Sequence, residues 1–136
     1  MKIESKIGKA SYPDSTIYNF ITDFNNFKNL IPKDQVTDWE SEKESCRFKI
    51  DPVGKTGLEI IEKVPSSLVK VSSIKELSQY DFTIWIQIVK VDKSESKIKI
   101  TIEPRVNEMI LQFVKSPLKQ FVDGLIDSLE KFDFNQ

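Results

Sequence analysis

The sequence contains no histidine and only one cysteine among its 136 residues. The absence of histidine removes the commonest general base and the commonest zinc ligand. Cys46 has no partner for an intrachain disulfide and no imidazole to activate it, so we expect it to pack as a small apolar residue. No glycine-rich nucleotide-binding motif and no G-x-S-x-G motif occurs. We therefore predict no catalytic residue, no metal site and no cofactor.

The chain also lacks an excess of charge of either sign and any long hydrophobic run. Its formal net charge is −1, with acidic and basic residues mixed throughout, which gives no electrostatic reason to expect a nucleic-acid partner. The most apolar run, residues 82–91, is too short and too alternating to span a bilayer. Residues 1–6 lack the apolar run of a signal peptide, and the lone cysteine suits a reducing compartment. We expect a cytoplasmic protein with no membrane segment, folded as one domain over residues 1–136.

The clearest pattern present is at residues 107–132, which predict a long amphipathic helix. Its apolar side chains recur at helical spacing: Ile110, Val114, Leu118, Phe121, Leu125, Leu129 and Phe132. Pro117 would cost about 3 kcal/mol inside a helix, whereas Ser116 could cap a new helix that begins with proline. We therefore expect a kink or break between a helix over 107–115 and one over 117–132. Gly124 and Ser128 on the apolar side either let the helix press close to a sheet or leave volume for a ligand.

Most of the remaining chain predicts strands. Residues 2–10 predict an opening strand with Ile3 and Ile7 on one face, followed by two short helices that end at Pro32. From residue 36 onward, apolar and polar residues alternate in segments 36–41, 46–51, 56–64, 68–74, 81–92 and 96–103. The alternation slips at residues 89–91, which indicates a bulge. Short polar turns join these segments, so we expect an antiparallel sheet with one apolar and one polar face.

Together these elements predict an α+β fold, in which a curved antiparallel sheet of six or seven strands wraps around the long C-terminal helix. Residues 14–27 with Leu30-Ile31-Pro32, and residues 117–125, resemble bacterial members of the START-like (SRPBCC) superfamily, and the order of elements is similar to its helix-grip fold. The resemblance implies a deep cavity between sheet and helix. Members bind lipids, sterols, polyketides, plant hormones or quinones there, and some, such as aromatase/cyclases, catalyse reactions. The family has no universal catalytic signature to carry onto this chain.

The favoured functional prediction is binding of a small hydrophobic ligand, such as a lipid, quinone or polyketide, by a carrier or sensor. We expect these residues to line its cavity: Trp39, Phe48, Leu58, Ile60, Val71, Phe82, Ile84, Ile86, Ile100, Met109, Phe113, Leu118 and Phe121. Trp39 is the expected inward anchor of an otherwise polar strand. Each buried side chain of this kind contributes about 1.5–3 kcal/mol, so a solid core would also be stable without a ligand. Periodicity alone does not separate the two.

Two alternatives remain open. A cyclase or dehydratase would need a buried, mutually close pair drawn from Tyr18, Tyr80, Asp23 and Glu103, facing the cavity. An interaction module would use the polar face of the sheet, where Trp85 is expected to lie. Trp85 either packs against neighbouring lysine stems and threonine or forms the centre of a homodimer contact, since exposed tryptophan is favoured at interfaces.

Overall fold

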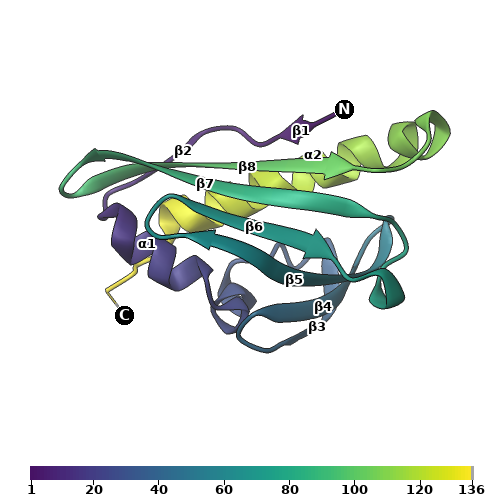
Figure 1. Ribbon diagram of the computed structural model, residues 1–136, viewed down its shortest axis with the longest axis horizontal. Coiled ribbons are helices and arrows are strands. Elements are labelled where there is room, and N and C mark those ends of the chain that lie inside the picture. Colours follow the sequence, from purple (N-terminus) through teal and green to yellow (C-terminus); the bar gives the residue numbers. More distant parts are fainter. Residues whose placement is uncertain (136) are drawn as a thin grey trace.

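The computed structural model describes residues 1–135 as an eight-stranded antiparallel sheet with a long helix lying across one face (Figure 1). The strand order is β1-β8-β7-β6-β5-β4-β3, and β2 pairs with β8. In chain order the elements are β1 (Ile3–Glu4), β2 (Gly8–Ala10), α1 (Asp14–Ile21), the 3₁₀-helix η1 (Phe24–Asn29), β3 (Val36–Ser41), β4 (Ser45–Ile50), β5 (Gly54–Val64), β6 (Leu68–Ser73), the 3₁₀-helix η2 (Lys75–Leu77), β7 (Phe82–Asp92), β8 (Glu95–Pro104) and α2 (Glu108–Lys131). The predicted α+β architecture is confirmed.

The sheet has eight strands because the predicted opening strand is divided into β1 and β2. Ile3 pairs with Ile102 and Gly8 with Ile98, so the N-terminal segment has one residue more than β8 between these two pairs. An extra residue reverses the alternation of faces. Ile3 is consequently buried whereas Ile7 is 61% exposed, and the prediction that both lie on one face is wrong.

Helix α2 is continuous from Glu108 to Lys131, with Pro117 in its interior, so the predicted break at Ser116 is absent. The Asn107 side chain caps the helix by accepting a hydrogen bond from the Ile110 backbone N–H at 2.9 Å. Val114 and Leu118, on either side of the proline, are both buried. Their packing on the sheet keeps the helix continuous through a position where local preference favours an end. No helix within residues 1–135 combines the length and the apolar character needed to cross a membrane.

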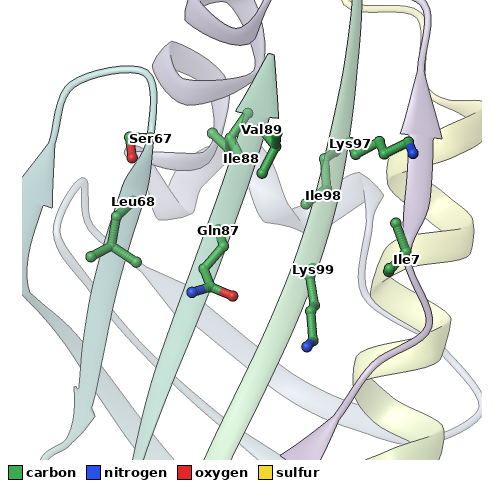
Figure 2. A pocket seen from close by; sticks show the side chains of 9 residues that line it. All are labelled: Ile7, Ser67, Leu68, Gln87, Ile88, Val89, Lys97, Ile98 and Lys99. Carbon is green, nitrogen blue, oxygen red and sulfur yellow. The ribbon is translucent and has the colours of Figure 1, made fainter. Parts of the chain in front are cut away.

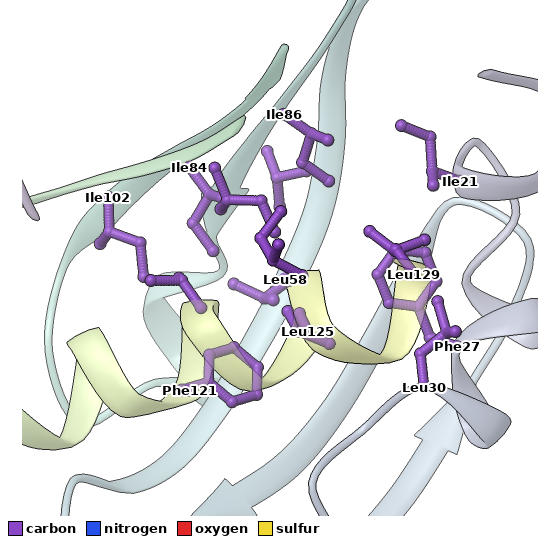
Figure 3. Packing of buried hydrophobic residues seen from close by; sticks show 14 of the residues in the cluster. Ile21, Phe27, Leu30, Leu58, Ile84, Ile86, Ile102, Phe121, Leu125 and Leu129 are labelled. Atoms are coloured by element: carbon purple, nitrogen blue, oxygen red, sulfur yellow. The ribbon is translucent and has the colours of Figure 1, made fainter. Parts of the chain in front are cut away.

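The hydrophobic core lies between the inner face of the sheet and α2. Figure 3 shows side chains from the sheet, among them Ile84, Ile86 and Ile102, facing Phe121 and Leu125 of α2. The three isoleucines of β8 at positions 98, 100 and 102 are almost fully buried, as their strict alternation with polar residues predicted. The expected contact between this strand and the terminal helix is therefore present.

Two short helices follow the first strands, as predicted, and close one end of the gap between sheet and α2. Helix α1 packs near the ends of β6 and β7 (Figure 1). Segment η1 is a 3₁₀-helix, capped by the Asp23 carboxylate, which accepts a hydrogen bond from the Asn25 backbone N–H at 2.9 Å. Its Phe24 and Phe27 side chains are buried in the core.

Three strands depart from regular pairing. The predicted irregularity in β7 is confirmed by a register shift between Lys90 and Asp92. A second shift lies in β5 between Ile60 and Glu62. The third lies in β3 and matters for the site, because it turns Trp39 toward the core.

Candidate functional site

A small cavity of about 30 Å³ lies between the sheet, α2 and η1. Its lining residues are Phe24, Phe27, Ile31, Trp39, Phe48, Leu58, Val71, Ile84, Ile86, Ile100, Phe121, Val122 and Leu125. The indole nitrogen of Trp39 is the one side-chain atom in this set that is neither carbon nor hydrogen. The wall therefore matches an apolar guest and has no charged group to offer.

Most of the residues predicted to line a cavity are brought together here: Trp39, Phe48, Leu58, Val71, Ile84, Ile86, Ile100 and Phe121. Phe82 and Leu118 instead border an adjoining void of about 10 Å³. Ile60 is half-buried against the core and lines neither space. Strand periodicity thus identified the sheet side chains that border this cavity, and their contact with a ligand stays a prediction.

Met109 and Phe113 do not reach the cavity, and the prediction that they line it is wrong. Their exposed fractions are 81% and 48%. The first turns of α2 project beyond the end of β8 (Figure 1), so there is no sheet to cover this face of the helix. On that part of α2 the buried side chains are Leu111 and Val114, which point the other way around the helix.

Several residues that line the cavity were not predicted from the sequence. Phe24, Phe27 and Ile31 come from η1 and the turn after it, and their spacing of three and four residues was the available signal. Val122 lies four residues after Leu118 and three before Leu125, which places it on the edge of the same apolar stripe. The side chains of η1 line the cavity because of where η1 packs on the core, and sequence periodicity does not reveal that position.

Trp39 enters the site through a distortion of the edge strand β3. Between the pairs Thr37–Lys49 and Glu40–Arg47, β3 contains one residue more than β4. The backbone accommodates this extra residue at Asp38. Its φ is +57°, in the left-handed region that non-glycine residues seldom occupy. The Trp39 ring then packs against Phe48, with ring centroids 5.3 Å apart and planes tilted by 32°. Its Nε1 atom is buried and has no hydrogen-bond partner among residues 1–135.

Within residues 1–135, no acid–base pair lines this cavity. The residues proposed for the enzyme alternative, Tyr18, Tyr80, Asp23 and Glu103, are half-buried and line neither space in the core. Cys46 is buried beside Leu58, and this burial raises the pKa of its thiol, so the group is neutral at physiological pH. The cavity wall supports binding and offers no group for proton transfer.

The polar face of the sheet has a shallow groove of about 370 Å³, shown in Figure 2. It is lined by Ile7, Ser67, Leu68, Gln87, Ile88, Val89, Lys97, Ile98 and Lys99. Nearby, the ammonium groups of Lys2 and Lys70 lie 5.2 and 5.8 Å from the centroid of the half-buried Trp85 ring. Trp85 therefore packs against lysine side chains on the polar face, in one of the two ways predicted, while its part in a dimer stays a prediction.

Known proteins resemble this chain in fold but not in sequence. No protein-family model matches the chain, and no curated protein matches its sequence. A solved structure of a START superfamily protein from Mycobacterium smegmatis nevertheless matches with a TM-score of 0.71 at 11% identity, covering 95% of this chain and 94% of that one. This chain has the START-like helix-grip fold.

Other helix-grip structures match over nearly the whole chain as well. A point mutant of norcoclaurine synthase from Thalictrum flavum, in complex with a transition-state analogue, has a TM-score of 0.66 at 14% identity, covering 93% of each chain. The Aha1 dimer from Colwellia psychrerythraea has a TM-score of 0.65 at 14% identity, covering 96% of this chain and 97% of that one. At such identities the likeness establishes the fold alone.

Proposed function

We propose that the protein binds a small hydrophobic ligand between its sheet and α2, as a carrier or sensor of a molecule such as a lipid, a quinone or a polyketide. The observation that carries the proposal is the cavity whose wall is built from hydrocarbon side chains of three separate elements. The helix-grip fold, whose members typically bind hydrophobic ligands, supports the same conclusion. The binding unit in this proposal is the whole chain as one domain, and its single unpaired cysteine suits the cytoplasm.

The size of the cavity defines what binding requires. About 30 Å³ holds on the order of two water molecules, whereas pockets for organic ligands span about 300–1,000 Å³. In our proposal the ligand makes its own space by displacing side chains at the end closed by η1. A single short 3₁₀ segment has little stability of its own, so it is the element most easily moved.

Few polar contacts hold η1 in place. The Phe24 backbone N–H donates to the Lys43 carbonyl at 2.8 Å, and the Ser41 hydroxyl donates to the Asn25 side-chain oxygen at 2.8 Å. The Asn26 side-chain amide donates to the Phe20 carbonyl of α1 at 2.9 Å. The other attachment is the burial of Phe24 and Phe27, whose rings lie 5.2 Å apart. An apolar ligand can replace those ring contacts with its own, which offsets the cost of moving the segment.

A matched pair of substitutions on α2 tests the proposal. Val122 lines the cavity and Val114, two turns earlier, is equally buried without lining it. Both Val→Phe changes overpack the core at a cost of about 1–3 kcal/mol. Titration of ¹⁵N-labelled protein with duroquinone and with methyl octanoate should shift cavity amides in the parent chain and in V114F, but not in V122F. Native mass spectrometry of the freshly purified protein gives a second readout, as added mass.

Two results would contradict the proposal. One is the absence of any cavity shift in the parent chain with either compound. The other is equal binding by V122F and the parent, which would place the compounds elsewhere on the molecule, for instance in the outer groove.

A further inference from the structure

We infer that the ligand carries a neutral hydrogen-bond acceptor, a carbonyl, ether or hydroxyl oxygen on an otherwise apolar body, and that the Nε1–H of Trp39 donates to it. This inference rests on the proposed function and specifies its ligand class. Pure hydrocarbons would fit the same wall. The indole nitrogen is the one group in the wall that would favour a ligand with an acceptor oxygen over a pure hydrocarbon.

The first step in the argument is the unpaired donor. Trp39 Nε1 is buried and lacks a hydrogen-bond partner among residues 1–135. Buried tryptophan N–H groups normally donate to an acceptor, because a buried donor without a hydrogen bond is unfavourable. The one other buried side-chain atom in this condition within the described residues, Gln35 Oε1, belongs to a residue outside the cavity wall whose amide nitrogen donates to the Pro117 carbonyl at 2.8 Å.

The second step is that the chain holds the indole in this position at a conformational cost. The preceding residue, Asp38, has φ of +57°, and the pairing of β3 with β4 is interrupted at this point. The Trp39 ring packs against Phe48. Phe48 in turn stacks on Phe121 of α2, with ring centroids 5.9 Å apart. A strained backbone residue beside an unsatisfied buried donor is the combination expected where a ligand completes the site.

The third step concerns what could pair with the indole. A water molecule in a protein interior needs two to four polar partners, and the other lining side chains are hydrocarbon. A carboxylate would lose its hydration without meeting a positive charge in the wall. A neutral oxygen on an apolar body satisfies the N–H and leaves no buried charge, which identifies the class.

The test uses two probes of the same shape, cyclohexanone and methylenecyclohexane, which differ by an oxygen in place of a CH₂ group. Dissociation constants for both are measured by NMR titration on the full-length parent chain, on W39F and on W85F as a control on the opposite face of the sheet. The ratio of the two constants, compared between variants, cancels the different hydration of the probes. The indole N–H resonance of Trp39 in the parent chain is a second readout that needs no substitution.

We expect the preference for cyclohexanone to fall about 3- to 10-fold in W39F and to stay unchanged in W85F. In the parent chain, cyclohexanone should move the Trp39 indole proton downfield, whereas methylenecyclohexane should not. An equal preference in W39F and parent, or identical indole shifts with both probes, overturns the inference and leaves the proposed function standing. If neither probe shifts any cavity resonance of the parent chain, both fail. The indole shift decides the matter should W39F not fold.

Discussion

Gly124 shows how the surroundings of one residue, rather than its type, set the effect of a change. The sequence left open whether Gly124 lets α2 press against the sheet or leaves volume for a ligand. A Cβ built there would lie 3.5 Å from Pro32 Cγ, in ordinary contact with the turn after η1. At Gly8 a Cβ would lie 2.6 Å from Ile126 Cγ2, which is too close. Gly8 therefore is the glycine that lets strand and helix approach, and Gly124 is replaceable.

These two glycines give the first prediction. Gly124→Ala should raise the free energy of unfolding by about 0.8–1 kcal/mol, because alanine is the better helix former and space is available. Gly8→Ala should lower it by about 1–3 kcal/mol, because Ile126 must move. Urea titration followed by circular dichroism measures both. A destabilised G124A protein would show that the Pro32 side chain leaves less space than the 3.5 Å separation indicates.

Cys46 gives a prediction about reactivity. Its thiol is buried in β4, and the loss of hydration raises its pKa, so the nucleophilic thiolate is scarce at pH 7–8. Ellman's reagent should label the folded protein negligibly over an hour and label it fully in 6 M guanidinium. Rapid labelling under native conditions would contradict this placement.

At the scale of elements, α2 illustrates why local preference failed to predict the structure. The sequence indicated a break because proline inside a helix costs about 3 kcal/mol. Burial of Val114 and Leu118, at about 1.5–3 kcal/mol each, outweighs that cost, and it depends on a sheet that lies far away in sequence. Met109 is 81% exposed because it lies off the apolar stripe, on the turns of α2 that project beyond β8.

Pro117 is therefore a tolerated cost, and its removal should stabilise the protein. Pro117→Ala restores a helical N–H and leaves the carbonyl that accepts from Gln35 in place. We expect the free energy of unfolding to rise by about 1–2 kcal/mol, since the proline's restriction of the unfolded chain offsets part of the gain. Thermal unfolding by calorimetry measures this. A lower melting temperature would mean that α2 needs the proline for its path along the sheet.

The start of β7 is tied to the link between β8 and α2 by an ion pair with a defined pH dependence. Arg105 donates through Nε and one terminal nitrogen to the two oxygens of Asp81, at 2.9 Å each. This guanidinium, and then the Ser73 hydroxyl, lower the pKa of Asp81 in the folded protein. The stability this provides is fully present above the pKa of the unfolded chain, about 3.9, and disappears as the pH falls through the lower folded pKa.

Arg105→Gln tests that tie. The pair is solvent-exposed, so the variant should lose at most about 1 kcal/mol at pH 7. The difference in the free energy of unfolding between parent and variant should become smaller below about pH 4, as Asp81 becomes protonated. The part that remains is due to the hydrogen bond from Arg105 to Thr83. Urea midpoints measured from pH 2.5 to 7 provide the comparison. A gap that does not change with pH would assign the whole effect to packing.

At the scale of the molecule, alternation of apolar and polar residues was enough to predict the sheet, its inner face and the helix that covers it. It succeeded for Ile84, Ile86 and Ile100 because successive side chains of a strand point to opposite faces, and only one face of this sheet is covered by the core. It could not predict the volume left between those side chains. That volume depends on how Phe48, Phe121 and the rings of η1 fit together, and periodicity does not encode it.

The outer face carries the remaining prediction, a homodimer contact near Trp85. The groove beside it joins Ile7, Leu68 and Val89 with two lysines, and Trp85 lies between Lys2 and Lys70. If this face pairs two copies, light scattering at 100 µM should give twice the monomer mass, and Trp85→Ala should return it to the monomer mass. A monomeric parent chain would remove the dimer and leave Trp85 as a support for lysine stems.

The interrupted outer strands have a consequence for behaviour at high concentration. At one border of the sheet Ser5 separates β1 from β2 and satisfies the backbone N–H of Ile100 with its hydroxyl at 2.8 Å, and at the other border Asp38 bends β3. Neither border offers a straight row of free amides and carbonyls onto which another chain could add. We therefore expect these irregularities of the outer strands to disfavour fibrillar self-assembly of this strand-rich molecule.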